Sequence, residues 1–481
     1  MIVNRWRRSG HTQRECGQAL VFMGYNSNNA SPGNLVSVSF PTSVAGVPSS
    51  AIPPSGIAAN AFMRVDVTDN VQTFFSGMLS GNRTQTVRSF AVCGLVLAAS
   101  PVPLLILDPK TSDAPTLDLQ GNPNVNIVGG PQRSVQVNSS ANNAVHIQGS
   151  ATLDLSLGGP SGTGSDLAVY GGPKTAPGGF NKGTNGHWYA PAAPLGDPFA
   201  QIPAPAIPAN GPLPNGVAVG KVNGCPDTTC QEFAPGYYPN GIDVKHNTAI
   251  FDPGIYYVVG GMKAEPLSCL RPSTAIGDGS GGALFYFADT NSLDVGSNSG
   301  KSCPTGAGTD FTTATGTGSL PFGAKCTAAS LLPANVPATL TGSVLLGPCR
   351  APSVGPLCAP NCAINYGDPL GTGNPIGEQR GILFFQNRSK GAAADFSGGG
   401  QFLLSGTMYL HQCVTGGSDT GLNCNSTSAF NTTINLGGNS GAGTIVGQIV
   451  VDRLSLGGTS GITMDLNPTG SFSLMKATLL R

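Results

Sequence analysis

Residues 125–170 give the clearest indication of the fold, because short apolar segments alternate there with turn residues. The first four segments begin about ten residues apart, and Gly, Asn and Ser fill the gaps between them. Evenly spaced short strands, without a helix to cover a parallel sheet, are typical of a β-solenoid or a meandering sandwich. The predicted strands are Val125-Asn126-Ile127-Val128, Val135-Gln136-Val137, Val145-His146-Ile147, Leu153-Asp154-Leu155-Ser156-Leu157 and Leu167-Ala168-Val169-Tyr170.

The same rhythm returns from residue 250 and continues almost to the end of the chain. We therefore predict a mainly β protein with an elongated β-solenoid or β-helix-like body, made of first β-rich repeats over residues 108–172 and a longer part over residues 236–481. The segments that carry this prediction are 250–260, 283–287, 292–295, 340–346, 381–386, 401–410, 432–436, 444–451 and 454–456.

Residues 25–107 have a different pattern and predict a small α+β module. Strands are expected at 35–40, 61–68 and 87–97, and the nearest approach to a helix-forming segment is 71–79. The apolar run 90–107 contains Pro101 and Pro103, so it favours two strands, 92–98 and 104–107, over a membrane-spanning helix.

Residues 173–235 interrupt the strand rhythm with many prolines. Such a segment is expected to be extended, and we interpret it as a linker or a long loop. The prolines that support this interpretation include Pro191, Pro194, Pro198, Pro203, Pro205, Pro208, Pro212 and Pro214.

The composition excludes some classes of protein. The 24 basic and 24 acidic side chains cancel, which excludes an electrostatic nucleic-acid binder. The 69 Gly and 39 Pro residues favour turns, while a hydrophobic share of 40% leaves enough apolar surface for a core and argues against plain disorder.

The twelve cysteines indicate an exported, oxidised protein. Ten of them fall between Cys225 and Cys424, mostly in loop-like stretches, with C-x4-C, C-x3-C and C-x10-C spacings that suit local disulfides better than zinc. Metal binding and buried free thiols are the alternatives that the spacing leaves open. His411 lies beside Cys413, but its position after the segment 402–410 is also that of a residue at a strand end.

The first 24 residues contain a basic start, with Arg5, Arg7, Arg8 and Arg14, followed by a short apolar segment around Leu20. That segment is too short for a secretory core or a membrane span.

Several short structural motifs are spread over most of the chain. They are Arg14-Glu15-Cys16-Gly17-Gln18-Ala19-Leu20-Val21, Ser31-Pro32-Gly33-Asn34, Phe62-Met63-Arg64-Val65-Asp66-Val67-Thr68, Val71-Gln72-Thr73-Phe74-Phe75, Thr86-Val87-Arg88-Ser89-Phe90-Ala91-Val92, Leu107-Asp108-Pro109, Val137-Asn138-Ser139-Ser140, Asp252-Pro253-Gly254-Ile255-Tyr256-Tyr257, Phe285-Tyr286-Phe287 and Gly381-Ile382-Leu383-Phe384-Phe385-Gln386. In these motifs the chain resembles TadE/TadG-like proteins of the tight-adherence (Flp) pilus system.

The resemblance implies a membrane-anchored envelope protein. After Val21 the family has about twenty apolar residues, and this chain does not; residues 1–24 are then a remnant of the anchor region, with the arginines as its cytoplasmic flank. A shortened gene product or a fragmentary gene model would explain the difference. The adhesion-type D-x-S-x-S metal motif of some members has its nearest match at Asp154-Leu155-Ser156, which lacks the last serine and fits strand alternation better.

A sugar-cleaving site would require acidic groups, or an acid and a base, on neighbouring strands. Asp252 and Asp289 lie in turn-like sequences, which favours a structural role for them. The candidates are Asp243, Lys245 and His246, followed by Asp252, Asp289 and Asp294.

Trp188 and Tyr189 in the proline-rich segment are candidates for sugar binding, although packing of a loop is the simpler interpretation.

Because each of these candidates has a simpler structural explanation, we expect no catalytic, cofactor-binding or metal-binding residues.

The protein is expected to be a non-enzymatic protein of the cell envelope or extracellular surface that supports pilus assembly or adhesion. Its expected partners are other pilus-assembly or envelope proteins and surface polysaccharide. The alternative is a carbohydrate-binding or carbohydrate-cleaving β-helix protein.

Overall fold

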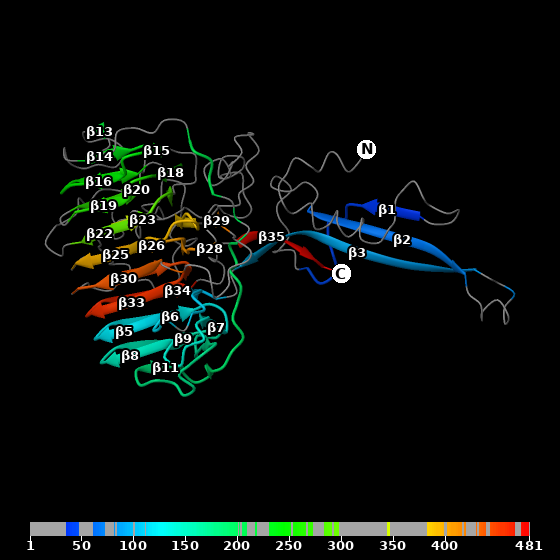
Figure 1. Cartoon of the computed structure of the whole chain (residues 1–481), viewed down its shortest axis with the longest axis horizontal. Coiled ribbons are helices and arrows are strands. Elements are labelled where there is room, and N and C mark those ends of the chain that lie inside the picture. The colour runs from blue at the N-terminus through cyan, green and yellow to red at the C-terminus, as the bar shows by residue number, and fades with distance from the viewer. Residues whose placement is uncertain are drawn as a thin grey trace. The chain divides into compact units, whose positions relative to one another are not determined.

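A computed structural model of the chain describes residues 35–47, 61–72, 81, 84–99, 102–110, 112–200, 202, 204–208, 217–218, 230–251, 254–265, 268–272, 283–290, 293–297, 344–346, 382–398, 402–415, 418–419, 430, 432–438, 443–466 and 473–480. Within these ranges the chain is mostly β-strand and has no helix, as the composition predicts (Figure 1). The chain divides into two compact units, residues 1–98 with 474–481, and residues 99–473. The larger unit is therefore inserted in the sequence of the smaller one.

The smaller unit is built on one four-stranded sheet with the order β1-β2-β3-β35. β2 pairs antiparallel with both β1 and β3. The backbone N–H of Leu480, just after β35, donates to the carbonyl of Val92 at 2.8 Å. The strands are β1 (Leu35–Ser39), β2 (Phe62–Gln72), β3 (Thr84–Ala99) and β35 (Ser473–Leu479).

The α part of the predicted α+β module is not seen. Val71 and Gln72, which begin the predicted helix, are the last residues of β2, and residues 73–79 lie outside the described residues. Their place in the β2–β3 ladder, opposite Gln85 and Thr84, overrides the weak local helix propensity. The apolar run 90–107 forms parts of β3 and β4 (Leu104–Ile106), as predicted. None of the described residues forms a helix that could cross a membrane.

The larger unit contains three parallel sheets, and the chain passes repeatedly from the ten-strand to the eight-strand to the eleven-strand sheet. The exception is residues 166–233, whose described strands lie only in the ten-strand and eleven-strand sheets. The ten-strand sheet contains β12 (Trp188–Tyr189), β10 (Asp166–Val169), β7 (Arg133–Val137), β4, β32 (Ile449–Val451), β27 (Thr407–Leu410), β24 (Ile382–Gln386), β21 (Ala283–Phe287), β18 (Gly254–Val258) and β15 (Gly236–Tyr238), in that order. The eight-strand sheet contains β16 (Ile242–Val244), β19 (Met262–Ala264), β22 (Leu293–Ser297), β25 (Ala393–Gly398), β30 (Thr433–Gly437), β33 (Arg453–Gly458), β5 (Leu117–Gly121) and β8 (Val145–Gly149).

The eleven-strand sheet contains β11 (Phe180–Asn181), β9 (Thr152–Gly158), β6 (Asn124–Gly129), β34 (Gly461–Leu466), β31 (Gly443–Val446), β26 (Phe402–Ser405), β23 (Val344–Leu346), β20 (Cys269–Pro272), β17 (Thr248–Phe251), β14 (Cys230–Phe233) and β13 (Val217–Ala218). Only its edge pair β13–β14 is antiparallel within these sheets. A separate antiparallel hairpin joins β28 (Val414–Thr415) and β29 (Ser418–Asp419).

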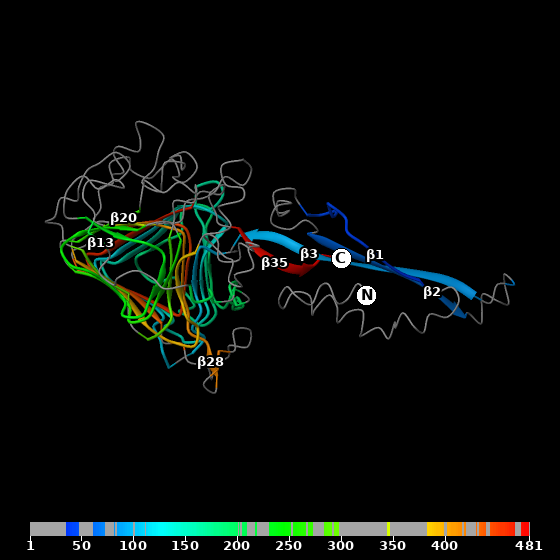
Figure 2. The same cartoon turned by 90° about the horizontal axis from the view of Figure 1, so that it is seen from above.

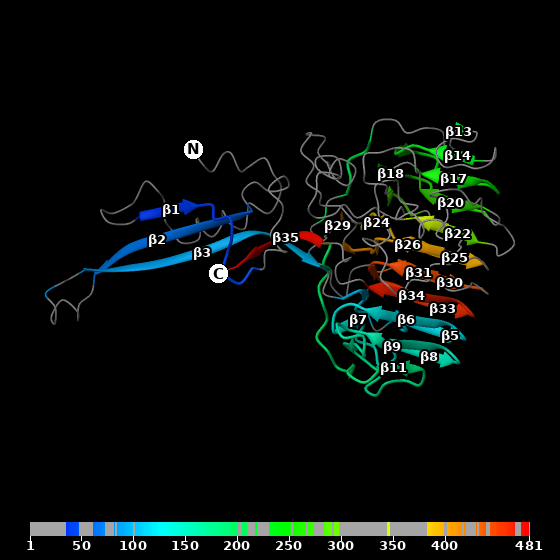
Figure 3. The same cartoon turned by 180° about the vertical axis from the view of Figure 1, so that it is seen from behind.

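The order of strands in space differs from their order in the sequence. The last strands, β32, β33 and β34, pair in parallel with β4, β5 and β6 from the start of the unit. Red and cyan strands are therefore neighbours in the lower half of the unit as drawn in Figures 1 and 3. Viewed from above, the strands of this unit lie over one another around a common outline (Figure 2).

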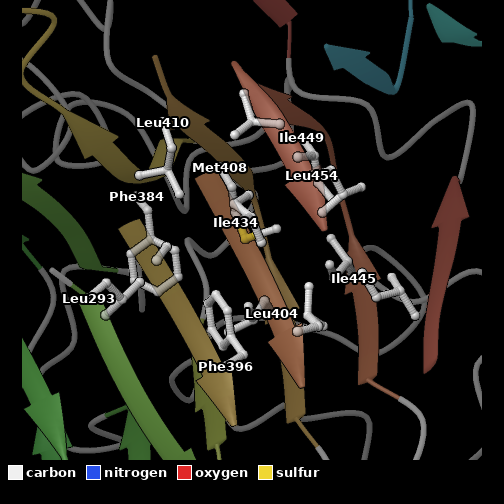
Figure 4. Packing of buried hydrophobic residues seen from close by; sticks show 14 of the residues in the cluster. Leu293, Phe384, Phe396, Leu404, Met408, Leu410, Ile434, Ile445, Ile449 and Leu454 are labelled. Atoms are coloured by element: carbon white, nitrogen blue, oxygen red, sulfur yellow. The ribbon is translucent and has the colours of Figure 1, made fainter. Parts of the chain in front are cut away.

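One face of each sheet points into a shared apolar core. Figure 4 shows side chains from neighbouring strands, such as Phe384, Met408 and Ile434, packed together there. An aromatic column runs through the core, with ring centroids 4.8 Å apart for Tyr256 and Phe285 and 5.8 Å apart for Phe285 and Phe384. Burial of these large rings removes much apolar area from water, which is the main favourable term in folding.

The predicted alternation in 153–157 fails at its last residue. Leu153 and Leu155 are fully buried, whereas Leu157 is 59% exposed. Asn126 pairs with Asp154 but Val128 pairs with Leu157, so β9 holds one extra residue at this point. Such a bulge reverses which face the following residue occupies.

The proline-rich segment 173–235 is not a simple linker in its described part. Phe180 and Trp188 lie in β11 and β12, which extend two of the parallel sheets. Residues 191–200 and Ile202 then follow without strand structure, and Phe199 is fully buried. Packing against the sheets, which local composition does not reveal, orders this part of the chain.

Three of the cysteines, Cys93, Cys269 and Cys413, are in disulfides. Cys413 is therefore a bridge cysteine and not a metal ligand beside His411. The predicted remnant of an anchor at residues 1–24 lies outside the described residues.

Candidate functional site

The outer face of the eight-strand sheet carries a row of polar side chains to which each strand contributes one residue, all in register. Each of these residues lies between two apolar residues that face the core, as in Ile242-Asp243-Val244. Neighbouring strands of a parallel sheet are about 4.8 Å apart, so the polar groups repeat at that spacing. We call this set the polar ladder; it contains Asp243, Lys263, Asp294, Asp395, Asn435, Ser455, Asp118 and His146.

Three of the residues predicted as a polar cluster meet at one end of the ladder. Lys245 Nζ lies 3.0 Å from Asp243 Oδ2. The hydrogen bond and the charge of Asp243 raise the pKa of Lys245, which therefore stays cationic. His246 Nε2 lies 3.5 Å from Glu265 Oε2 on the next strand connection.

Lys263 completes this end of the ladder. Its Nζ lies 3.9 Å from Glu265 Oε1, and its side chain is 56% exposed. The cluster thus mixes ammonium groups, carboxylates and an imidazole on one accessible surface. Such a surface exchanges hydrogen bonds with neutral or charged polar ligands.

The middle of the ladder brings two carboxylates to adjacent strands. Asp294 pairs in register with Asp395, and Asn435 Nδ2 donates to Asp395 Oδ1 at 2.7 Å. Asp294 is a residue that the sequence predicts as a candidate. Asp395 and Asn435 are not predicted, because their partners in the ladder are known only from the pairing of strands.

The far end of the ladder holds a histidine–carboxylate pair. His146 Nδ1 lies 2.8 Å from Asp118 Oδ1, and Gln120 Nε2 donates to Asp118 Oδ2 at 2.6 Å. The carboxylate orients the imidazole, whose side chain is 38% exposed. Ser455 precedes Asp118 in the ladder, so Ser455 and His146 flank the carboxylate and are not themselves neighbours.

The other candidates do not join the ladder. Asp289 Oδ2 accepts the backbone N–H of Gly260 at 2.8 Å, as expected of a carboxylate in a turn. Asp252 lies outside the described residues. Asp154 Oδ1 accepts the backbone N–H of Ser156 at 2.8 Å, so this carboxylate makes a local hydrogen bond within its own strand.

Trp188 packs against the core and so does not present a free ring for a sugar. Its ring meets Phe180 edge-on with centroids 5.1 Å apart, and its indole N–H donates to the Pro173 carbonyl at 3.0 Å. Its neighbour Tyr189 is 43% exposed and lies on the outer face.

Within the described ranges, no group of three or more His, Cys, Asp or Glu side chains is placed to hold a metal ion. The apolar–polar–apolar triplets Leu-Asp-Leu at 117–119, Val-His-Ile at 145–147 and Ile-Asn-Leu at 434–436 are the signal by which the ladder can be found in the sequence.

Comparison with family models, curated proteins and solved structures finds no match to this chain.

Proposed function

We propose that this protein is a non-enzymatic protein of the cell envelope that attaches to surface polysaccharide through the polar ladder. The larger unit would be a β-helix in which the three sheets are its faces, since the chain passes through them in the same order from β4 to β9 and again from β15 to β27 and from β30 to β34. The family resemblance in the sequence supports a TadE/TadG-like role in pilus assembly or surface adhesion. Disulfides at Cys93, Cys269 and Cys413 support an oxidising location.

The observation that carries this proposal is the regular repeat of the polar ladder. A polysaccharide is also a repeating array of hydroxyl groups, with charged groups in some polymers. Carboxylates, amides and ammonium groups at a repeat of about 4.8 Å can contact successive sugar units along one direction. Each contact is weak, but several in a row add up along one chain.

Binding of purified full-length protein to immobilised acidic and neutral polysaccharides tests the proposal. Replacing Lys263, Asp294 and Asp395 together by Ala, Asn and Asn removes three successive charged groups of the ladder, none of which is buried. We expect affinity to fall by at least tenfold, equivalent to about 1.4 kcal/mol. The control is Asp154→Asn, whose carboxylate lies on another sheet and serves its own turn. Equal binding by the triple variant and the native protein would rule out the ladder as the binding face.

A second function is favoured by the carboxylates Asp294 and Asp395 on adjacent strands, with Lys263 beside Asp294. This is the placement that sugar cleavage by an acid and a base requires. Incubation with the bound polysaccharide distinguishes the two functions. Reducing ends or unsaturated sugars that appear with the native protein and vanish with Asp395→Asn would replace the binding role by a cleaving one.

The envelope location is tested separately. Fractionation of native cells and treatment with external protease should find the protein protease-sensitive and in the envelope fraction. Recovery only from the cytoplasm would contradict the envelope role, whatever the result of the binding experiment.

A further inference from the structure

Residues 191–200 together with Ile202 run along the outer face of the ten-strand sheet, and we call them the strap. Asn138 fixes it at Leu195, because Nδ2 donates to the Leu195 carbonyl at 2.7 Å and Oδ1 accepts the Leu195 N–H at 3.0 Å. Arg388 fixes its end by donating to the carbonyls of Phe199 at 3.4 Å and Ile202 at 3.0 Å. Asn138 and Arg388 follow different strands, β7 and β24, so the strap extends across the sheet.

Between these two attachments the strap places a carboxylate against the sheet. The side chain of Asp197 is only 7% exposed, and Tyr409 donates its hydroxyl to Asp197 Oδ2 at 2.6 Å. The ring of Phe199 packs on that of Tyr409 with centroids 5.1 Å apart. A buried carboxylate is costly unless hydrogen bonds and an opposite charge compensate it.

His411 can supply that charge. Its Nδ1 lies 2.5 Å from Asp452 Oδ1, and its Nε2 lies 3.9 Å from Asp197 Oδ2. Asp452 is held by the sheet, because its Oδ2 accepts the backbone N–H groups of Gln412 and Thr432. The imidazole thus lies between one carboxylate of the sheet and one of the strap.

The groups around His411 determine its protonation. Burial alone would lower the pKa of His411, but Asp452 and Asp197 outweigh burial and raise it above its ordinary value. Arg388 acts in the opposite direction, since its positive charge lowers the pKa of His411. Tyr409 stays protonated because burial raises its pKa well above the ordinary value. The Phe430 ring lies against the His411 ring, and Lys110 Nζ lies over the Phe430 ring. Asp108 and Asp452 are close enough for their like charges to interact.

We propose that the strap is a proton-controlled cover, closed while His411 is an imidazolium between Asp452 and Asp197, and released when His411 loses its proton. Loss of that proton leaves the Asp197 carboxylate without the positive charge at 3.9 Å while it remains buried. Lifting the strap returns Asp197 to water and relieves this cost. The surface uncovered includes the outward ring of Tyr409 and the Arg388 side chain that lies over Phe385.

The sign of the pH effect follows from the direction of the pKa shift. A histidine with a raised pKa in the folded protein stabilises the closed strap fully at acid pH. That stabilisation disappears as the pH rises through the raised pKa. The sheets themselves do not depend on this contact, so the strap should open before the unit unfolds.

Hydrogen exchange of the full chain between pH 5 and pH 9, corrected for the intrinsic pH dependence, tests the proposal. We expect protection of strap peptides covering residues 192–202 to fall by roughly tenfold as the pH rises, because the closed strap then loses the imidazolium that stabilises it. Peptides covering residues 407–413 should keep their protection. Strap protection that does not change with pH would overturn the proposal, as would equal loss in both sets of peptides.

Variants distinguish the effect of the His411–Asp197 contact from changes in the overall stability of the protein. His411→Gln and Asp197→Asn should each remove the pH dependence of strap protection. Asp197→Asn changes only the strap side and keeps an acceptor for Tyr409, so it remains informative if His411→Gln does not fold. The control is His146→Gln, which removes a histidine from a partly exposed histidine–carboxylate pair on the polar ladder, away from the strap. Retained pH dependence in Asp197→Asn, or its loss in His146→Gln, would overturn the assignment to His411.

Discussion

At the scale of single residues, Asp108 is a buried acid whose charge is poorly compensated. Its Oδ1 accepts the Lys110 backbone N–H at 2.9 Å, while Oδ2 has no hydrogen bond and lies 4.0 Å from Arg453 Nε. Burial raises the pKa of Asp108 to about 7. The folded protein therefore binds this proton more tightly than the unfolded chain does, and stability falls as the pH rises from about 4 to about 7.

Asp108→Asn should flatten this part of the stability profile, by about 2 kcal/mol between the two ends after allowance for screening. Urea unfolding of the native protein and the variant at pH 4, 5.5 and 7.5 measures the change. Asp154→Asn, on the outer face of another sheet, is the control. Parallel profiles for Asp108→Asn and the native protein would show that Asp108 keeps an ordinary pKa.

Two neighbouring glycines in β33 have opposite requirements. Gly458 has φ +72°, and an added Cβ would lie 2.6 Å from the Gly438 carbonyl oxygen of the adjacent strand connection. Gly457 has free space around the position of a Cβ. Gly458→Ala should cost about 2 kcal/mol or more in unfolding free energy, while Gly457→Ala stays within about 0.5 kcal/mol of the native value. Equal midpoints for the two variants in chemical denaturation would contradict this steric account.

At the scale of elements, strand β9 offers a test of which face is the core. The bulge near Leu155 sends Leu157 outward after two buried leucines. Leu155→Ala should therefore destabilise the protein by about 2–4 kcal/mol through lost burial and the cavity left behind. Leu157→Ala should change the unfolding free energy by less than about 0.5 kcal/mol. Thermal and urea unfolding measure both, and a costly Leu157→Ala would mean that strict alternation holds and the bulge is absent.

At the scale of the whole molecule, the larger unit joins its beginning to its end. The chain reaches residue 208 after β12, yet β4, β5 and β6 lie beside β32, β33 and β34 in all three sheets. A cut in the exposed chain near Ala206 therefore separates two pieces that share continuous parallel ladders. The backbone hydrogen bonds and the apolar core at this junction should hold the pieces together.

A protease site inserted at Ala206 tests this arrangement. After complete cleavage under reducing conditions, both pieces should coelute in gel filtration as one particle and separate only in denaturant. Spontaneous separation in native buffer would contradict the pairing of the first and last strands. The uncut protein with the same insertion controls for effects of the insertion itself.

Local sequence was sufficient for most of the strands in the described ranges, but not for the end of β2 at residues 71–72 or for β11 and β12. The apolar–polar alternation within 125–170 predicts strands because successive side chains of a strand point to opposite faces. The short, continuous apolar run at 283–287 predicts a strand that is buried on both faces. A high glycine content and few charged helix formers account for the lack of helix. Asp243, Lys245 and His246 could be grouped because they are close in the sequence.

Only the tertiary structure decided which strands are neighbours. Asp294 lies beside Asp395, and Leu117 beside Leu454, because parallel pairing joins segments separated by whole passages through the sheets. The polar ladder, the bulge that turns Leu157 outward and the contact of Asp197 with His411 all depend on such pairings. Side-chain periodicity fixes which face of a strand is buried, whereas the choice of partner depends on the free energy of the complete packed core.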